Sequence, residues 1–227
     1  MTLKEFSKSL TKEEVKGELI NTVFVSLITS FVILGVLYFA KLKYIENFIP
    51  KYGFYLFFSA LSYALILPAI RQVRAYKELP CMSGMMVGMT LGMISGFLPG
   101  FYVASTNGMF IGGFFGSTIG IIIGAWNGKC CGIMGVMEGI MAGFMGGLMG
   151  AMTAFMLFND NLKIAAILVF IIGAIIIFGL NYMLYKETKQ LERRRKEGQF
   201  LTISLTFFLT IITTWLIVFG PRSEIFS

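Results

Sequence analysis

Histidine is absent from all 227 residues of this chain. Histidine is the commonest general base of enzymes and the commonest protein ligand of zinc and haem iron, so its absence argues against metal-dependent hydrolases and haem electron carriers. The glycine-rich stretches lack the lysine and hydroxyl residue of a phosphate-binding loop, and they do not follow a strand. This argues against kinases and nucleotide-driven machines, and we expect a protein that is not an enzyme.

Charge is also scarce, because only 19 basic and 12 acidic side chains accompany a hydrophobic content of 56%. At about 1.5 Å per residue, a helix needs about 20 apolar residues to cross the roughly 30 Å hydrocarbon core of a membrane. Backbone groups in lipid must find their hydrogen bonds within the segment, which favours helices. The composition therefore predicts an all-α, polytopic integral membrane protein with seven spans, at residues 19–40, 53–70, 82–100, 108–126, 133–157, 164–184 and 200–220.

The spans form a single predicted transmembrane domain, residues 19–220, with no separate soluble domain. Residues 1–18 are predicted to be a cytoplasmic amphipathic segment, because Leu3, Phe6 and Leu10 share one helical face. The first apolar stretch is longer than the core of a typical signal peptide, and no small-residue cleavage site follows it. Residues 221–227 form a short C-terminal tail.

Lysine and arginine set the predicted orientation. With the N-terminus in the cytoplasm, 14 of the 19 basic residues fall on the inner side, including the run from Lys186 to Lys196. The positive-inside rule then predicts a cytoplasmic N-terminus and an external C-terminus, in the plasma membrane. The basic residues border the spans and alternate with carboxylates, which indicates contact with lipid headgroups rather than with nucleic acid.

Glycine and methionine are concentrated in the middle of the chain. Between Met82 and Met156 lie 13 of the 15 methionines and 19 of the 26 glycines. Most of these glycines recur every fourth residue, and small residues at this spacing let helices in lipid approach closely. We therefore predict a glycine-zippered, methionine-rich core made of the third, fourth and fifth spans. The same glycine faces are also suited to dock a partner membrane subunit or a second copy of the chain.

Sulfur-containing side chains are also concentrated in this part of the chain. On the fifth span Met134, Met141, Met145 and Met149 lie within about 60° of Glu138 at 100° per residue. Thioethers and thiolates are soft ligands that suit Cu(I) and Ag(I). We predict two facing methionine ladders that carry such an ion to thiols at the inner mouth and on to a cytoplasmic metallochaperone. The third span and the mouth supply the remaining predicted ligands, Met82, Met85, Met86, Met89, Met93, Cys81, Cys130 and Cys131.

The pairing of Met-xxx-Met with Gly-xxx-Gly resembles the high-affinity copper transporters of eukaryotes. The resemblance covers these spacings only, because those transporters have three spans. It implies that a methionine ladder on a glycine-bearing helix can carry Cu(I).

Glu138 is the one carboxylate well inside a predicted span, about 8 Å from its inner end at 1.5 Å per residue. An ionisable group within a membrane is costly, which favours a functional role. The alternative is that Glu138 reaches interfacial water or Lys129 and anchors the helix. Methionine also fills irregular gaps without any metal. The predicted function is transport or sequestration of a soft metal ion, and the alternatives are a non-catalytic docking subunit or a channel for another small solute.

Overall fold

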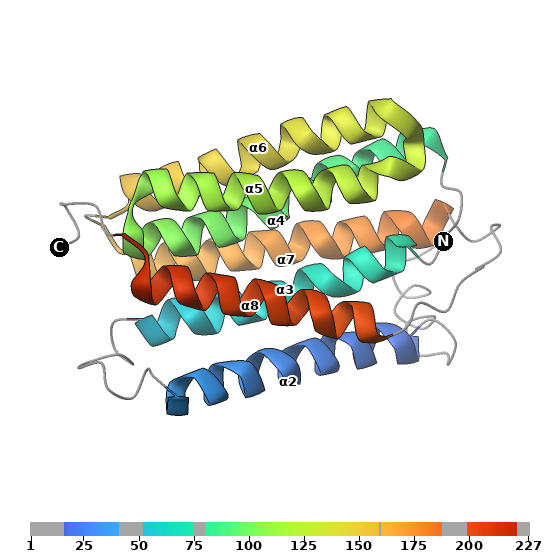
Figure 1. Ribbon diagram of the computed structural model, residues 1–227. Helices are drawn as coiled ribbons and strands as arrows, with labels where there is room; N and C mark the ends of the chain where they lie inside the picture. The colour runs from blue at the N-terminus through green and yellow to red at the C-terminus, as the bar shows by residue number, and fades with distance from the viewer. Residues whose placement is uncertain (1–15, 41–51, 75–79, 159, 188–198, 222–227) are drawn as a thin grey trace.

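The computed structural model describes residues 16–40, 52–74, 80–158, 160–187 and 199–221, and within them it contains helices and no strand (Figure 1). The α-helices are α2 (Lys16–Ala40), α3 (Phe54–Arg74), α4 (Cys81–Asn107), α5 (Met109–Gly128), α6 (Gly132–Met156), α7 (Leu162–Glu187) and α8 (Gln199–Phe219). Each coincides with one predicted apolar stretch, so the all-helical prediction is confirmed. Most of the predicted 1–18 and 221–227 segments lie outside the described residues.

Six helical segments of the described chain are long and apolar enough to cross a membrane. They are Thr22–Phe39, Phe54–Arg74, Cys81–Asn107, Met109–Met156, Leu162–Leu184 and Thr202–Phe219. The segment Met109–Met156 contains α5, the short 3-10 helix η3 (Lys129–Cys131) and α6 in direct succession. By the length and composition of these helices, the chain is an integral membrane protein.

Two glycines reverse the chain within the α4–α6 region. Gly108 is the single residue between α4 and α5, and its φ is 107°. Gly132, where α6 begins after η3, has a φ of 74°. Residues with a Cβ rarely adopt this left-handed region, whereas glycine enters it without steric cost. Helices α4, α5 and α6 therefore fold back on one another and lie side by side (Figure 1).

The contact between these three helices is backbone against backbone. A Cβ placed on Gly116 of α5 would lie 2.6 Å from the carbonyl oxygen of Gly96 in α4. One on Gly120 would lie 2.7 Å from the carbonyl oxygen of Gly143 in α6, and one on Gly92 would lie 2.9 Å from that of Gly139. No real Cβ fits at such distances, so the three helices approach this closely only because these positions are glycine.

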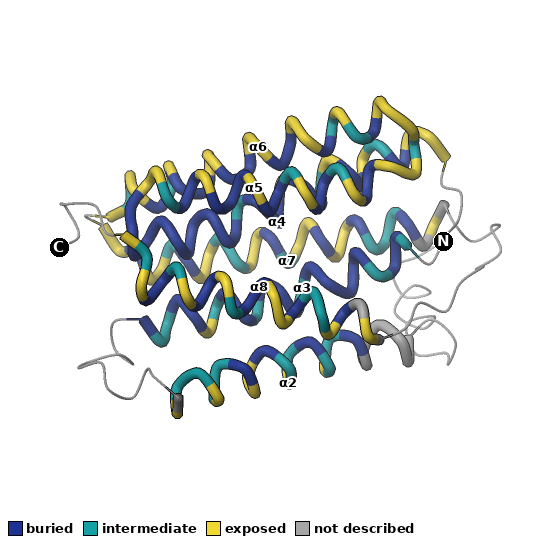
Figure 2. The backbone as a smooth tube through the Cα atoms, viewed as in Figure 1, coloured by how far each residue is buried: buried dark blue, intermediate teal, exposed yellow. Residues whose placement is uncertain are grey.

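Helix α4 joins the α4–α6 unit to the rest of the protein. It contacts α5 and α6 on one side and α3, α7 and α8 on the other, and every residue from Leu98 to Asn107 is buried (Figure 2). Tyr102 is fully buried and accepts a hydrogen bond from Ser62 of α3 at 3.3 Å. At the end of α4, the Asn107 side-chain amide donates to the carbonyl of Leu216 in α8. Helix α2 packs on α3 and α8.

Replacing Gly116 or Gly120 by leucine should unfold or disassemble the protein. The new side chain would meet backbone that has no room to move, and overpacking costs about 1–3 kcal/mol and occasionally more. Thermal unfolding of the purified protein in detergent would measure the loss. Gly173 in α7 is the matched control, because a Cβ there comes no closer than 3.5 Å to the flexible side chain of Leu98. Equal melting temperatures for all three variants would show that the close approach does not stabilise the fold.

Candidate metal centre

Three thiols meet at the end of the molecule where α4 begins. Cys81 is the first residue of α4, and Cys130 and Cys131 lie in η3, about 50 positions along the chain. The Cys131 thiol donates to the carbonyl of Cys81 at 2.6 Å, and the Cys81 sulfur lies 4.0 Å from the carbonyl of Cys131. A Cβ on Gly84 would lie 3.2 Å from the Cys130 sulfur and 3.3 Å from the Cys131 sulfur. The missing side chain of Gly84 is what leaves space for two sulfurs beside α4.

The three cysteines are free thiols, exposed at Cys81 and Cys130 and half-buried at Cys131. Burial, followed by the adjacent Cys81 thiol, raises the pKa of Cys131 to about 11. Burial also raises the pKa of Cys130 above its ordinary value. A thiophilic metal ion would have to displace the thiol protons of Cys130 and Cys131 to bind these residues as thiolates.

The thiols alone do not form a preorganised metal site. Among the described residues, no three cysteine or carboxylate side chains are placed to hold one ion. A soft ion at this end would need either a rotation of the thiols or thioethers from the neighbouring methionines. Met85 is the nearest candidate, because it is half-buried on α4 and its backbone N–H interacts with the Cys131 thiol.

Apart from the half-buried Met85, the predicted methionine ligands lie on the outer surface of α4 and α6, where Figure 2 shows α6 exposed along its length. We name these exposed side chains, which are between 37% and 79% accessible, the methionine band: Met82, Met86, Met89 and Met93 of α4, and Met134, Met137, Met141, Met145, Met149, Met152 and Met156 of α6. The buried face of α6 consists of glycine and alanine. The predicted passage between two facing ladders therefore differs from the structure, because glycine contacts leave no space inside the three-helix unit.

The α4 and α6 methionines of the methionine band lie along one line of contact between the two helices, which we call the seam. Gly146 of α6 packs directly against the backbone of Met93, and Gly150 packs against that of Phe97. Helices α4 and α6 both begin at the cysteine end, since α5 returns the chain between them (Figure 1). The methionines of α4 and α6 thus form adjacent rows on one outer face instead of opposite walls of a channel.

Glu138 lies on this seam. It precedes Ala142 and Gly146 by four and eight residues, so it shares the face of α6 that packs on α4. Gly88 lies against the carbonyl of Gly135, and Gly92 lies against that of Gly139, which puts Glu138 at the level of the turn between Gly88 and Gly92. The carboxylate is half-buried. A carboxylate thus accompanies the thioethers within two helical turns of the thiols.

Basic residues surround the cysteine end. The Arg74 guanidinium, at the end of α3, lies 4.3 Å from the ring centre of Trp126 in α5. Arg71 donates to the Thr22 hydroxyl of α2 at 2.6 Å, and Lys129 begins η3. Their positive charge disfavours the binding of a second cation nearby.

Sequence reasoning missed two features of the other helices. The buried face of α2 carries Thr22, Ser26 and Ser30, and that of α8 carries Thr202, Thr206 and Thr210. Their spacing of four residues was visible in the sequence and is typical of packed helices in lipid. On α8 the threonines donate to carbonyls one turn earlier, as Thr210 does to Thr206 at 2.7 Å. The second feature is an apolar pocket between α2, α3 and α7.

The comparisons with known proteins place no family on this site. No protein-family model, no curated protein and no solved structure matches the chain.

Proximity of the thiols predicts a specific cross-link. In the Cys130→Ser variant, mild oxidation should join Cys81 to Cys131 within one chain, because each sulfur already lies beside the other residue's carbonyl. Peptide mass spectrometry would identify the bond, and migration as a monomer in denaturing gels would show that it is internal. The Cys131→Ser variant, which retains Cys81 and Cys130, is the control and should cross-link more slowly. Failure of the first variant to cross-link would contradict the thiol cluster.

Proposed function

We propose that this protein crosses the membrane seven times and that α4, α5 and α6 form its glycine-zippered core. Helices α5 and α6 contain 20 and 25 residues, which correspond to about 30 Å and 37 Å at 1.5 Å per residue, so each is long enough to cross separately. Their glycine contacts support a hairpin instead of one continuous helix. The excess of basic residues on one side supports a cytoplasmic N-terminus and an external C-terminus.

The proposed function is the binding and movement or storage of a soft monovalent metal ion, Cu(I) or Ag(I), without nucleotide hydrolysis. The observation that carries it is the convergence of Cys81 with Cys130 and Cys131, about 50 positions away in the sequence, at the end of the two helices that bear the methionine band. Thiolate and thioether sulfur prefer these ions over harder metals. Cys81, Cys130, Cys131 and Met85 would bind the ion at the inner end, from which a soluble metallochaperone would collect it.

The exposed position of the methionine band has a consequence for the path of the ion. A cation bound only by side chains that face lipid would be strongly disfavoured. We therefore propose that two copies of the chain place their methionine bands together, so that the ladders face each other across the interface between copies. Glu138 would lie at the edge of this interface and provide negative charge to the cation.

A second function has one observation in its favour. The methionine band is a continuous apolar face of unbranched, adaptable side chains, which is typical of surfaces that dock other helices. In this alternative the protein is a non-catalytic subunit of a larger membrane complex, and the sulfur atoms pack without metal.

Metal binding separates the two proposals. Under reducing conditions the purified protein should bind Ag(I), and joint replacement of Met141, Met145 and Met149 by leucine should weaken binding at least about tenfold, or about 1.4 kcal/mol. Leucine nearly preserves methionine's volume, so folding should survive. Titration calorimetry and cellular metal content are the measurements. The control replaces Met109 and Met183, which lie outside the methionine band, by leucine. Unchanged binding and metal content in the triple variant would favour the docking subunit.

Glu138→Gln adds an independent readout, because it keeps the shape of the side chain and removes its charge. We expect slower metal movement with near-normal thermal stability if the carboxylate meets the ion. A variant with normal metal content but a lower melting temperature would instead assign Glu138 to helix anchoring.

Orientation is tested by a thiol reagent that cannot cross membranes. Because 14 of the 19 basic residues fall on the proposed inner side, Cys81, Cys130 and Cys131 should react only when the cytoplasmic face is accessible. Inverted and right-side-out vesicles provide the two arms of the experiment. Labelling of Cys130 and Cys131 from outside, with Cys81 labelled from inside, would contradict the seven-span arrangement.

A further inference from the structure

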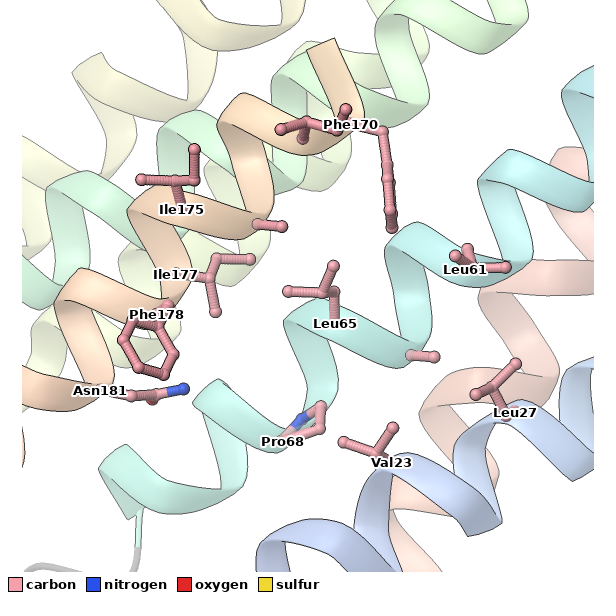
Figure 3. Close-up of a pocket in the computed structure, with 13 residues that line it drawn as sticks. Val23, Leu27, Leu61, Leu65, Pro68, Phe170, Ile175, Ile177, Phe178 and Asn181 are labelled. Carbon is pink, nitrogen blue, oxygen red and sulfur yellow. The ribbon is translucent and has the colours of Figure 1, made fainter. Parts of the chain in front are cut away.

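An apolar pocket of about 590 Å³ opens between α2, α3 and α7, away from the cysteines and the methionine band (Figure 3). In Figure 3, Leu65 and Pro68 of α3 lie opposite Ile177 and Phe178 of α7, and α2 closes the third side. The lining residues are Val23, Leu27, Leu61, Ala64, Leu65, Pro68, Phe170, Ile171, Ala174, Ile175, Ile177, Phe178 and Asn181. All but Asn181 have apolar side chains, so the pocket suits a hydrocarbon and excludes an ion.

The pocket has the depth of one leaflet. It extends along α7 from Phe170 to Asn181, a rise of about 16 Å at 1.5 Å per residue. The hydrocarbon core of a bilayer is about 30 Å thick, so a single leaflet contributes about 15 Å. A polar residue occurs only at the Asn181 end of this wall, which is the end nearer Lys186.

Two amide side chains at this end have buried acceptor atoms. The Oδ1 atom of Asn181 is buried and has no hydrogen-bond partner among the described residues. Gln72 follows Pro68 by four residues, so it lies one turn farther along the same face of α3. Its side chain is 6% exposed, and its Oε1 atom likewise has no partner in the described part of the chain. Neither acceptor is satisfied within the described part of the chain, so both are open to a donor that a ligand carries.

A cation lies at the same level. Arg71 precedes Gln72 and donates to Thr22, which is the residue before the lining residue Val23. Guanidinium groups bind phosphate oxygens strongly. The pocket thus presents apolar side chains along its wall, amide acceptors at one end and a guanidinium beside these acceptors. This order matches the order of groups in a phospholipid.

We propose that this pocket binds one phospholipid of the leaflet at the Lys186 end, with an acyl chain between α3 and α7. Its headgroup carries N–H or O–H donors, as phosphatidylethanolamine and phosphatidylglycerol do, which satisfy Gln72 and Asn181. Its phosphate lies beside Arg71. Phosphatidylcholine binds less well, because its quaternary ammonium has no hydrogen to donate.

Native mass spectrometry of the delipidated protein tests the site with three phospholipids of identical acyl chains. Phosphatidylethanolamine or phosphatidylglycerol should form a one-lipid adduct at least about fivefold more abundant than phosphatidylcholine does. Asn181→Leu and Gln72→Leu should remove this preference. Ala174→Phe, which fills the pocket, should remove the adduct of all three lipids. The matched control, Ile176→Phe, adds bulk to the same helix at an exposed position that does not line the pocket. Equal binding of all three lipids to the wild type would overturn the headgroup assignment.

A second measurement needs no variant. A phospholipid with a photoreactive group on its acyl chain should label peptides from α3 and α7 in preference to those from α5 and α8. The latter helices border another apolar cavity of about 440 Å³, whose lining includes Thr118 but no amide or charged side chain. Equal labelling of the two places would show general coating by lipid and overturn the site. An undiminished adduct of a folded Ala174→Phe protein in the mass spectrometry experiment would do the same.

Discussion

The close approach of three backbones is the constraint on which the rest of this structure depends. Helices in lipid gain little from the hydrophobic effect, so they associate through contact and through weak polar interactions. In α4, α5 and α6 the contact surface is glycine, with carbonyl oxygens directly against Cα atoms. Because the buried face of α6 has room only for glycine and alanine, the large side chains of α6 point outward. The methionine band is therefore a geometric consequence of the glycine ladder, whatever its chemistry.

The same constraint brings the thiols together. Gly84, Gly88 and Gly92 let α4 lie against η3 and α6 from its first turn, and Cys81 begins that turn. A bulkier residue at Gly84 would collide with Cys130 and Cys131. The cysteines are thus neighbours because the small residues near them in the sequence let the helices pack closely. A soft-metal site at this end would depend on this helix packing more than on the sequence next to the cysteines.

Much of this architecture was predictable from the sequence. Apolar length predicted the helices, because lipid leaves the chain few alternatives. The outward direction of Met141 and Met145 was not predicted. A helical wheel shows that methionine and glycine occupy different sides of α6. It does not show that α4 and α5 together cover the glycine side completely. Asn181 and Gln72 were missed because a single amide in an apolar run carries no periodic signal, and only tertiary structure shows that its oxygen is unpaired.

The glycines through which α4, α5 and α6 make contact are chemically identical. This gives the short connections between these helices an additional role. Sliding α4 along α5 by four residues, or about 6 Å at 1.5 Å per residue, would again place glycine against glycine. Packing alone therefore defines several registers of similar energy. The single residue Gly108 between α4 and α5, and the three residues of η3 before α6, are too short to permit such a slip. These turns therefore select one of the registers of similar energy. In that register Cys81 lies beside Cys131.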